Sequence, residues 1–385
     1  MRRPAIAVLL CVPLIAATCP ESTPPPPNGT LPVVATVLVP QDYGLHDTFV
    51  RDGLAFLCVW DSGVLIYDVG KGVAGGSPAN PKRVSKVVTS GSNIGGAMAH
   101  NAWWFHNPNG EKKYLFVGQE GPGRVGASSS GNIHVVDVSN LAQPVEVASY
   151  AMTGAGTHNF WMDEAAGVLF AAYYNGGVVA LDVSGTLSGD LASRELGRIQ
   201  PGDSTDTYVW GVMQSGGLVY AVDMLSGLWQ LMFTGASFAI TGGGFNVDDR
   251  FGSDLWVTDD YAYTGTWGGA TRKGRFGNAV KIWDLTGAPV LTDSVIVSGV
   301  RTVSDVQVTA DDSLLVISTE AGDSAGVHVY SLKDPEHPVK RAALYVSQGV
   351  HTATVAEIGG RRYVFAARNP PSPALLIIDI TTVRP

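Results

Sequence analysis

One short apolar segment that ends in an acidic residue recurs along this sequence, and no other feature constrains the fold as strongly. The segment is a run of aliphatic and β-branched residues followed by Asp, as in the Gly-Val-Val-Ala-Leu-Asp-Val of residues 177–183. Seven copies occur, at residues 63–69, 132–138, 177–183, 227–233, 279–285, 326–332 and 374–380. Apart from one longer gap, successive copies are roughly 45 to 50 residues apart, the period of repeats that each fold as a four-stranded sheet.

The repeat is clearest at residues 144–184, where it contains four short apolar runs. These lie at 145–150, 158–162, 168–174 and 178–183, and residues typical of turns separate them. Each run is alternating or β-branched and predicts a strand, and the short turns predict an antiparallel meander. A sheet this small cannot cover both of its faces, so neighbouring sheets must stack around an axis. The sequence therefore predicts an all-β fold, a seven-bladed β-propeller of four-stranded antiparallel blades.

The two ends of the predicted propeller belong to one blade. Residues 31–40 resemble the strand that follows the Asp segment in other repeats, such as 144–150 and 338–345. The seventh Asp segment, at 374–380, has no such strand after it. We therefore expect residues 33–39 to pair with the C-terminal blade and close the ring, which protects two strand edges. The expected blades are 46–88, 100–150, 158–199, 208–240, 254–297, 305–345, and 351–380 with the N-terminal strand.

Residues 1–18 have the three parts of an export signal: Arg2 and Arg3, an apolar stretch too short to span a bilayer, and small residues. Residues 16–19, Ala-Ala-Thr-Cys, resemble the lipobox of bacterial lipoproteins, which implies cleavage before Cys19 and lipidation of that residue. Thr18 replaces the usual Gly or Ala, so cleavage by ordinary signal peptidase is the alternative. Residues 19–31 form a Pro-rich tether and 32–385 the propeller. We expect an exported protein that is lipid-anchored on the periplasmic or cell-surface side of a bacterial membrane.

The charge and the cysteines narrow the classes of partner. The formal net charge is −9, whereas nucleic acid and anionic lipid both require a cationic face. We therefore expect no nucleic-acid partner, no membrane contact besides the lipid anchor, and a monomer. The three cysteines are Cys11 in the leader, Cys19 and Cys58. They offer no disulfide framework, and Cys58, inside a predicted strand, is expected to be a buried thiol.

At the recurring segments the chain resembles the LVIVD-repeat family, which is named for its Leu-Val-Ile-Val-Asp strand. The resemblance is closest at residues 375–379, Leu-Leu-Ile-Ile-Asp, and at 133–137, Ile-His-Val-Val-Asp. It covers nearly everything after the tether and implies an exported bacterial β-propeller, but it implies almost nothing about activity. Met232 and Ser331 replace the Asp in two copies, so those blades are expected to cap that strand differently.

Residues that could carry chemistry recur at the start of the first strand of each blade. In one register these are His46, His100, His158, Tyr208, Asp254, Asp305 and His351. The first strand of a propeller blade is the innermost, so these side chains are expected around one rim of the central channel. Glu120 and Glu320 end second strands near the same rim. Imidazoles that converge with these carboxylates, namely Asp254, Asp305, Glu120 and Glu320, would suit copper, zinc or iron. Nitrous oxide reductase and the selenium-binding protein family are similar in this placement of histidines only.

Structural explanations compete with the metal hypothesis. A His or Asp at this position can be a feature of the repeat that bonds the turn between blades, and the pairs His46-Asp47 and His100-Asn101 fit that interpretation. Trp60, Tyr174 and Trp267 end second strands near the rim and are expected either to pack or to form the floor of a pocket. The Gly-Asp-Ser-Ala-Gly at 322–326 matches a serine-hydrolase pattern, but no helix follows it, so it is expected to be a turn.

Three functions remain open from the sequence. The first is a binding or scaffold module with an unknown protein or small-molecule ligand at the channel face. The second is a metal-dependent enzyme, most plausibly an oxidoreductase, in which His46, His100, His158 and His351 bind the metal and Glu120 or Glu320 accepts a proton. The third is a surface protein with a purely structural role. The geometry of the four imidazoles discriminates between these functions, because a metal site needs their nitrogens within about 5 Å of one point.

Overall fold

The computed structural model describes residues 30–40, 44–91, 96–121, 123, 125, 127–202, 207–244, 250–268 and 275–385. The predicted signal peptide, Cys19 and nearly all of the tether lie outside these residues, so their predictions remain untested. Within the described ranges, no helix is long and apolar enough to cross a membrane. The described chain is almost entirely β-structure, as the sequence predicts.

The strands form small antiparallel meanders in chain order. The first sheet contains β2 (Asp47–Arg51), β3 (Leu54–Cys58), β4 (Val64–Asp68) and β5 (Lys82–Val87). The second contains β6 (Ala99–Trp104), β7 (Tyr114–Gln119), β8 (Ile133–Asp137), β9 (Val145–Tyr150) and the short β13 (Gly189–Asp190), which pairs parallel with β9. The third contains β10 (Phe160–Asp163), β11 (Val168–Ala172), β12 (Val178–Asp182) and β14 (Glu195–Ile199), with the 3-10 helix η1 (Ala192–Arg194) before β14. The fourth contains β15 (Val209–Ser215), β16 (Leu218–Asp223), β17 (Gly227–Phe233) and β18 (Phe238–Gly243).

The remaining strands form one large sheet and one that joins both ends of the described chain. The large sheet has eight strands: β19 (Phe251–Val257), β20 (Tyr261–Trp267), β21 (Ala279–Asp284), β22 (Val290–Ile296), β23 (Thr302–Val308), β24 (Leu314–Glu320), β25 (Gly326–Ser331) and β26 (Val339–Tyr345). Its two meanders are joined into one sheet by the pairing of Thr266 with Val303. The last sheet contains β27 (Val350–Ile358), β28 (Arg361–Arg368), β29 (Ala374–Asp379) and β1 (Val33–Leu38), and β1 pairs antiparallel with β29.

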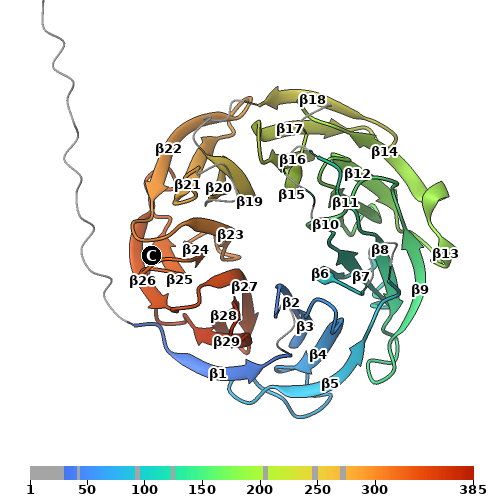
Figure 1. The fold of residues 1–385 in the computed structure, drawn as a ribbon, viewed down its shortest axis with the longest axis horizontal. Helices are drawn as coiled ribbons and strands as arrows, with labels where there is room; N and C mark the ends of the chain where they lie inside the picture. The colour runs from blue at the N-terminus through green and yellow to red at the C-terminus, as the bar shows by residue number, and fades with distance from the viewer. Residues whose placement is uncertain are drawn as a thin grey trace, which may run out of the picture.

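The sheets are arranged around a central axis, with the first strand of each meander nearest the axis (Figure 1). These inner strands are β2, β6, β10, β15, β19, β23 and β27, and the fourth strands lie at the periphery. One detail of the predicted repeat is wrong. Residues 145–150, which open the repeat as it appears in the sequence, pair with β8 and not with β10. The sequence repeat therefore begins one strand before the sheet.

Apolar side chains of neighbouring sheets form the core. One cluster joins Phe56 of the first sheet to Leu115 of the second, and another joins Phe116 of the second to Leu169 of the third. Further clusters follow between the later neighbours around the axis. One cluster joins the last sheet back to the first, with Phe365 and Leu57 both fully buried in it. Each sheet thus covers its faces with its neighbours, as the small size of the meander requires.

The recurring Asp ends the third strand of a meander and caps the turn after it. In five meanders its Oδ1 accepts the backbone N–H two residues further on; these are Asp68, Asp137, Asp182, Asp284 and Asp379. Such Asx turns satisfy backbone donors that a sheet edge leaves open. Ser331 replaces this cap with its hydroxyl, which accepts the N–H of Lys333. After Met232, the N–H of Thr234 donates to the carbonyl of Ser237 instead. The prediction that these two copies are capped differently is confirmed.

Candidate functional site

A β-bulge at the start of each inner strand builds the site. In β6, Ala99 pairs with Gln119 and Asn101 with Gly118, which leaves His100 as the extra residue. The pairing shifts in the same way at the start of β15, β19, β23 and β27, and the backbone bonds before β10 repeat it at His158. A bulge re-aims side chains that would otherwise alternate between the two faces of a strand. It here turns the first residue of each bulge toward the channel rim.

The first bulge residues are His46, His100, His158, Trp210, Ser253, Ser304 and His351. The predicted register is therefore right for the four histidines and wrong for the other three inner strands. Tyr208 lies before its bulge, and Trp210 takes the equivalent place. Asp254 and Asp305 are the second residues of their bulges. A bulge adds one residue without a sequence signal of its own, so a register counted from sequence is off by one or two positions.

The four imidazoles lie against one another around one arc of the channel. The ring centroids of His351 and His46 are 4.2 Å apart, those of His46 and His100 are 4.5 Å apart, and those of His100 and His158 are 4.2 Å apart. Ligand atoms of His46, His100 and His351 all lie within 4.8 Å of one another. Ligand atoms of His100, Glu120 and His158 do so as well, so two overlapping groups of three share His100.

His158 presents a free lone pair to the channel. Its Nδ1 is 2.7 Å from the carbonyl oxygen of Trp210, and a carbonyl only accepts hydrogen bonds. Nδ1 therefore carries the proton, and Nε2 carries the lone pair. Among the described residues, that Nε2 is buried without a hydrogen-bond partner, as is Nδ1 of His100. Both side chains are about 2% exposed. Buried polar atoms without partners are rare in folded proteins, so these two nitrogens are candidate ligand-binding atoms.

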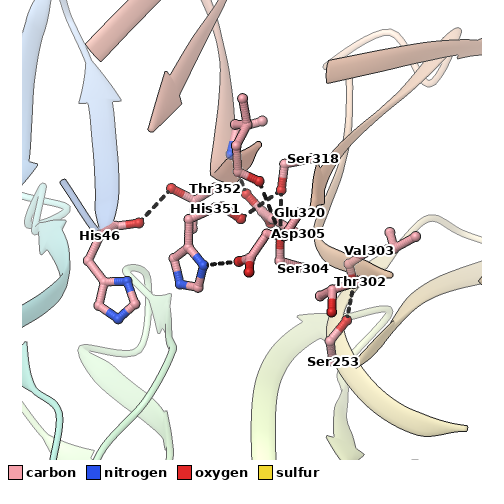
Figure 2. A network of polar contacts seen from close by, with 12 residues as sticks. His46, Ser253, Thr302, Val303, Ser304, Asp305, Ser318, Glu320, His351 and Thr352 are labelled. Atoms are coloured by element: carbon pink, nitrogen blue, oxygen red, sulfur yellow. Dashed lines mark hydrogen bonds and ion pairs between the residues drawn. The ribbon is translucent and has the colours of Figure 1, made fainter. Parts of the chain in front are cut away.

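Carboxylates hold the other two imidazoles. Nε2 of His46 is 3.0 Å from Oε2 of Glu120, and Nε2 of His100 is 3.7 Å from the same oxygen. The hydroxyl of Tyr174 donates to Oε1 of Glu120. Nδ1 of His351 bonds Oε1 of Glu320, and the imidazole of His351 lies beside that of His46 (Figure 2). Nε2 of His351 is the nitrogen that remains for a metal. A metal-binding histidine usually has this arrangement, with one ring nitrogen bonded to a carboxylate or carbonyl and the other available to the metal.

The protonation states favour neutral imidazoles beside an ionised carboxylate. Burial lowers the pKa of His46, and the neighbouring His351 lowers it further. Burial also holds the pKa of His100 and the pKa of His158 well below the ordinary value. Burial opposes ionisation of Glu120, and the positive charges that His100 and His46 acquire on protonation lower its pKa. The hydrogen bonds of His46 and Tyr174 lower it further and persist when the imidazoles are neutral. Burial likewise opposes protonation of His351, but Glu320 outweighs it and raises that pKa. At neutral pH, therefore, three of the imidazoles carry lone pairs that can bind a metal.

The remaining predicted residues fall into two groups. Trp60, Tyr174 and Trp267 surround the histidines at equivalent positions, with ring centroids 4.8 Å from His46, 5.0 Å from His158 and 6.1 Å from His351 respectively. Trp60 and Tyr174 adopt φ of +43°, a backbone conformation that non-glycine residues rarely take and that is common at functional sites. Asp305 lies outside both groups of potential metal ligands, and its Oδ2 accepts the N–H of Ala353. Residues 322–326 form a turn between β24 and β25, as predicted.

Two further layers of side chains lie below the histidines, and neither was predicted from the sequence. The second bulge residues form a polar layer of Asp47, Asn101, Asn159, Asp254, Asp305 and Thr352 that lines a cavity of about 270 Å³. Two residues further on lies a layer of Phe49, Trp103, Trp161, Met213, Trp256, Gln307 and Thr354, which lines the same cavity. The signal was present in the sequence, because Trp103 and Trp161 each follow a predicted histidine by three residues.

Comparisons with known proteins identify the fold and no family. No protein-family model and no curated protein sequence matches this chain. A chain in the crystal structure of the mitotic checkpoint complex superposes with a TM-score of 0.64 at 14% identity, and the match covers 98% of this chain and 99% of that chain. The computationally designed Ika8 protein superposes with a TM-score of 0.51 at 10% identity, covering 87% and 83% of the two chains. Together with the strand-rich architecture, these similarities indicate a β-propeller-like fold.

Proposed function

We propose that the chain is a closed seven-bladed β-propeller of the LVIVD-repeat type. The eight-stranded sheet then counts as two blades that a single residue pair joins. Seven apolar clusters support this count, because each is shared by two consecutive meanders and one of them joins the last to the first. The pairing of β1 with β29 supports closure by the N-terminal strand. The recurring Asp segments carry the resemblance to the family.

The function that this geometry supports best is a binding module whose channel holds one transition-metal ion. The observation that carries the proposal is His158, whose tautomer is fixed by the Trp210 carbonyl and whose buried Nε2 faces the other imidazoles without a partner. His46, His100 and His351 complete the histidine set, and Glu120 is the adjacent carboxylate. Imidazole and carboxylate together suit zinc, copper or iron.

The distances fit a site that closes around an ion with small side-chain rotations. Two ligand atoms on one ion, each at about 2.0–2.2 Å, are at most about 4.4 Å apart. The ligand atoms of each group of three lie within 4.8 Å of one another. Glu320 on His351 and Trp210 on His158 would then be outer partners that orient the rings. Asp305 is better assigned to the layer below than to the metal.

A metal-dependent oxidoreductase is the second candidate. The cavity favours it, because His100, His158 and His351 line the same 270 Å³ space as the aromatic side chains, which leaves room for a substrate beside the ion. Glu120 or Glu320 would be the proton acceptor next to that ion. Oxidase turnover by the metal-loaded protein that is absent in His158→Ala would separate this role from binding alone.

Metal titration of the purified protein tests the proposal. We expect one ion of copper, zinc or iron per chain by elemental analysis after reconstitution. His158→Ala and His100→Ala should each weaken binding at least about tenfold, because each removes a direct ligand. His328→Gln is the matched control, because His328 is also fully buried but lies on β25 and bonds the Ser324 carbonyl. Failure to bind any of the three metals, or equal losses in His328→Gln, would refute the metal site.

We further propose that the protein is exported and held on a bacterial membrane through a lipidated Cys19. The support is the sequence of residues 1–19 alone. Mass spectrometry of the mature N-terminus distinguishes the two forms, because a lipoprotein begins at a diacylglyceryl-modified Cys19 and a secreted protein at an unmodified residue nearby. The ligand or partner at the channel face and the monomeric state remain proposals of the same kind.

A further inference from the structure

The lower part of the 270 Å³ cavity, which we call the chamber, has a lining whose chemistry differs from that of the histidines above it. Its lower wall is an arc of aromatic side chains from successive inner strands. The ring centroids of Phe49 and Trp103 are 5.2 Å apart, those of Trp103 and Trp161 are 5.3 Å apart, and those of Trp161 and Trp256 are 6.4 Å apart. Trp161 and Trp256 come from β10 and β19, so they approach each other past the intervening β15. The arc therefore forms a continuous aromatic floor.

The aromatic floor is held in place from the opposite side. A shallow depression at the other mouth is lined by Phe49, Trp103 and Trp161 together with Arg51 and Glu164. Nη2 of Arg51 lies 2.9 Å from Oε2 of Glu164, and this pair spans from β2 to the turn after β10. Oε1 of Glu164 also accepts the indole N–H of Trp103 at 3.3 Å. The indole of Trp103 is thus held in place before any ligand arrives. Trp161 and Trp256 lie nearly perpendicular to each other, so the rings surround the chamber from different directions.

The wall above the aromatic floor is acidic. Asp47, Asp254 and Asp305 line the cavity, and neither Lys nor Arg lines it in the described part of the chain. Nδ2 of Asn159 donates to Oδ1 of Asp254 at 2.8 Å. Burial and the adjacent Asp305 raise the pKa of Asp254 well above its ordinary value, so this pair of carboxyl groups retains a proton that an entering cation would displace.

Asn101 adds a second sign of a missing partner. Its side chain lines the cavity and is about 3% exposed, and its Oδ1 has no hydrogen-bond partner. An acceptor buried in this way costs free energy unless a donor reaches it. This oxygen now lies against Gly118 on the neighbouring strand, and a rotation of the amide group would bring it to a cation with N–H groups in the cavity.

We propose that this chamber binds a small organic ammonium ion, with its carbon atoms on the aromatic floor and its charge beside Asp254 and Asp305. Aromatic faces attract cations, and the attraction is strongest where water is excluded, as it is in a cavity closed by tryptophans. Carboxylates above the rings supply the counter-charge. An inorganic ion would instead need a shell of oxygen ligands, which an aromatic floor cannot supply. This proposal does not depend on the metal site above it.

Calorimetric titration of the full chain after removal of metal tests the chamber. The compounds are tetramethylammonium, choline and phenethylammonium, and the uncharged control is 3,3-dimethylbutanol, which has the shape of choline without its charge. We expect at least one of the three cations to bind at millimolar concentration or better, at least about tenfold more tightly than the alcohol. Absence of binding by all three, or equal binding of the alcohol, would overturn the proposal.

Two substitutions assign the binding to this chamber. Trp161→Leu removes part of the floor, and Asp254→Asn removes a charge while keeping the shape of the side chain. Each should weaken ammonium binding at least about tenfold. Asp182→Asn, which removes a carboxylate on β12 far from the channel rim, should leave it within about twofold. His46→Ala, at a histidine that does not line this cavity, should weaken metal binding at least about tenfold and leave ammonium binding within about twofold, so the two proposals fail separately. Unchanged affinity in a folded Trp161→Leu and a folded Asp254→Asn would also contradict this assignment.

Discussion

The surroundings of each carboxylate decide its role in this molecule. Asp68 ends β4 and is fully buried, and its two oxygens accept the backbone N–H groups of Gly70, Lys71, Gly72, Ala74 and Gly76. Burial opposes its ionisation, but these donors outweigh burial and lower its pKa to about 2. Asp254 accepts hydrogen bonds from the Asn159 amide and the backbone N–H of Leu255, but burial and the adjacent Asp305 outweigh these donors and raise its pKa. Asp68 is therefore ionised as a structural cap, whereas Asp254 retains a proton unless a cation lies beside it.

Asp68→Asn should destabilise the protein by about 2 kcal/mol at neutral pH. The Asn amide would direct its N–H₂ at backbone donors that now bond the second carboxylate oxygen. Because the folded pKa is below the unfolded value, the stabilisation by Asp68 is complete above about pH 4 and is lost as the pH falls through 2. The difference between the variant and the natural protein should therefore shrink in acid. Urea unfolding at pH 7 and pH 3 measures it, with Asp284→Asn as the control, since Asp284 caps only the turn at Thr286.

At the scale of the strand, the recurring bulge is the element on which the site depends. The residues opposite the bulges are Cys58, Gly118, Ala172, Val222, Gly265, Ser318 and Ala367. They are small or medium in size, because two residues of the inner strand crowd against one. A Cβ on Gly118 would lie 2.0 Å from Oδ1 of Asn101, and one on Gly265 would lie 2.3 Å from Oγ of Ser253. Small residues at this position therefore permit the bulge.

Gly265→Ala should cost about 1 to 3 kcal/mol of stability. The new methyl group would also lie 2.6 Å from the backbone carbonyl oxygen of Val303, which cannot move without disturbing the bond it accepts from Ser253. Gly287→Ala is the matched control, because no atom lies within 4 Å of the position its Cβ would occupy. Thermal unfolding of both variants measures this difference in stability. Equal stability of the two would mean that the bulges tolerate larger residues.

The sequence predicted the strands better than the site. The strands follow from the period of the apolar residues, and the Asp caps follow from the chemistry of turns, so both were visible in residues such as Asp137 and Asp182. The convergence of His46, His100, His158 and His351 followed from their common register. The places of Trp210, Asp254 and Asp305 did not, because a bulge changes register without a characteristic residue. The aromatic floor was not predicted from the sequence. The tryptophans lie three residues after the histidines, and this spacing places them in one layer only when the strands surround a common axis.

At the scale of the whole molecule, the N-terminal strand links the two ends of the described chain. β1 pairs with β29 from Val33 to Leu38, and Val34, Ala35 and Val37 pack on the cluster that joins the last sheet to the first. Thr352 of the last sheet also donates to the carbonyl of His46 in the first (Figure 2). His46 and His351 therefore face each other only while these two sheets stay together. The contact between the first and last sheets and the histidine cluster are therefore coupled.

A chain that begins at Gly44, and so lacks β1, should lose both stability and metal binding. The exposed edge of β29 would attract other chains, and the lost apolar contacts should cost about 3 to 6 kcal/mol. A chain that begins at Thr30 keeps β1 and serves as the control for removal of the leader and tether. We expect the shorter chain to unfold at lower temperature, to aggregate, and to bind the metal more weakly, since His46 and His351 are no longer held 4.2 Å apart. Equal unfolding temperatures and equal metal affinities of the two chains would show that β1 does not close the ring, because a strand that joined the first and last sheets could not be removed without cost.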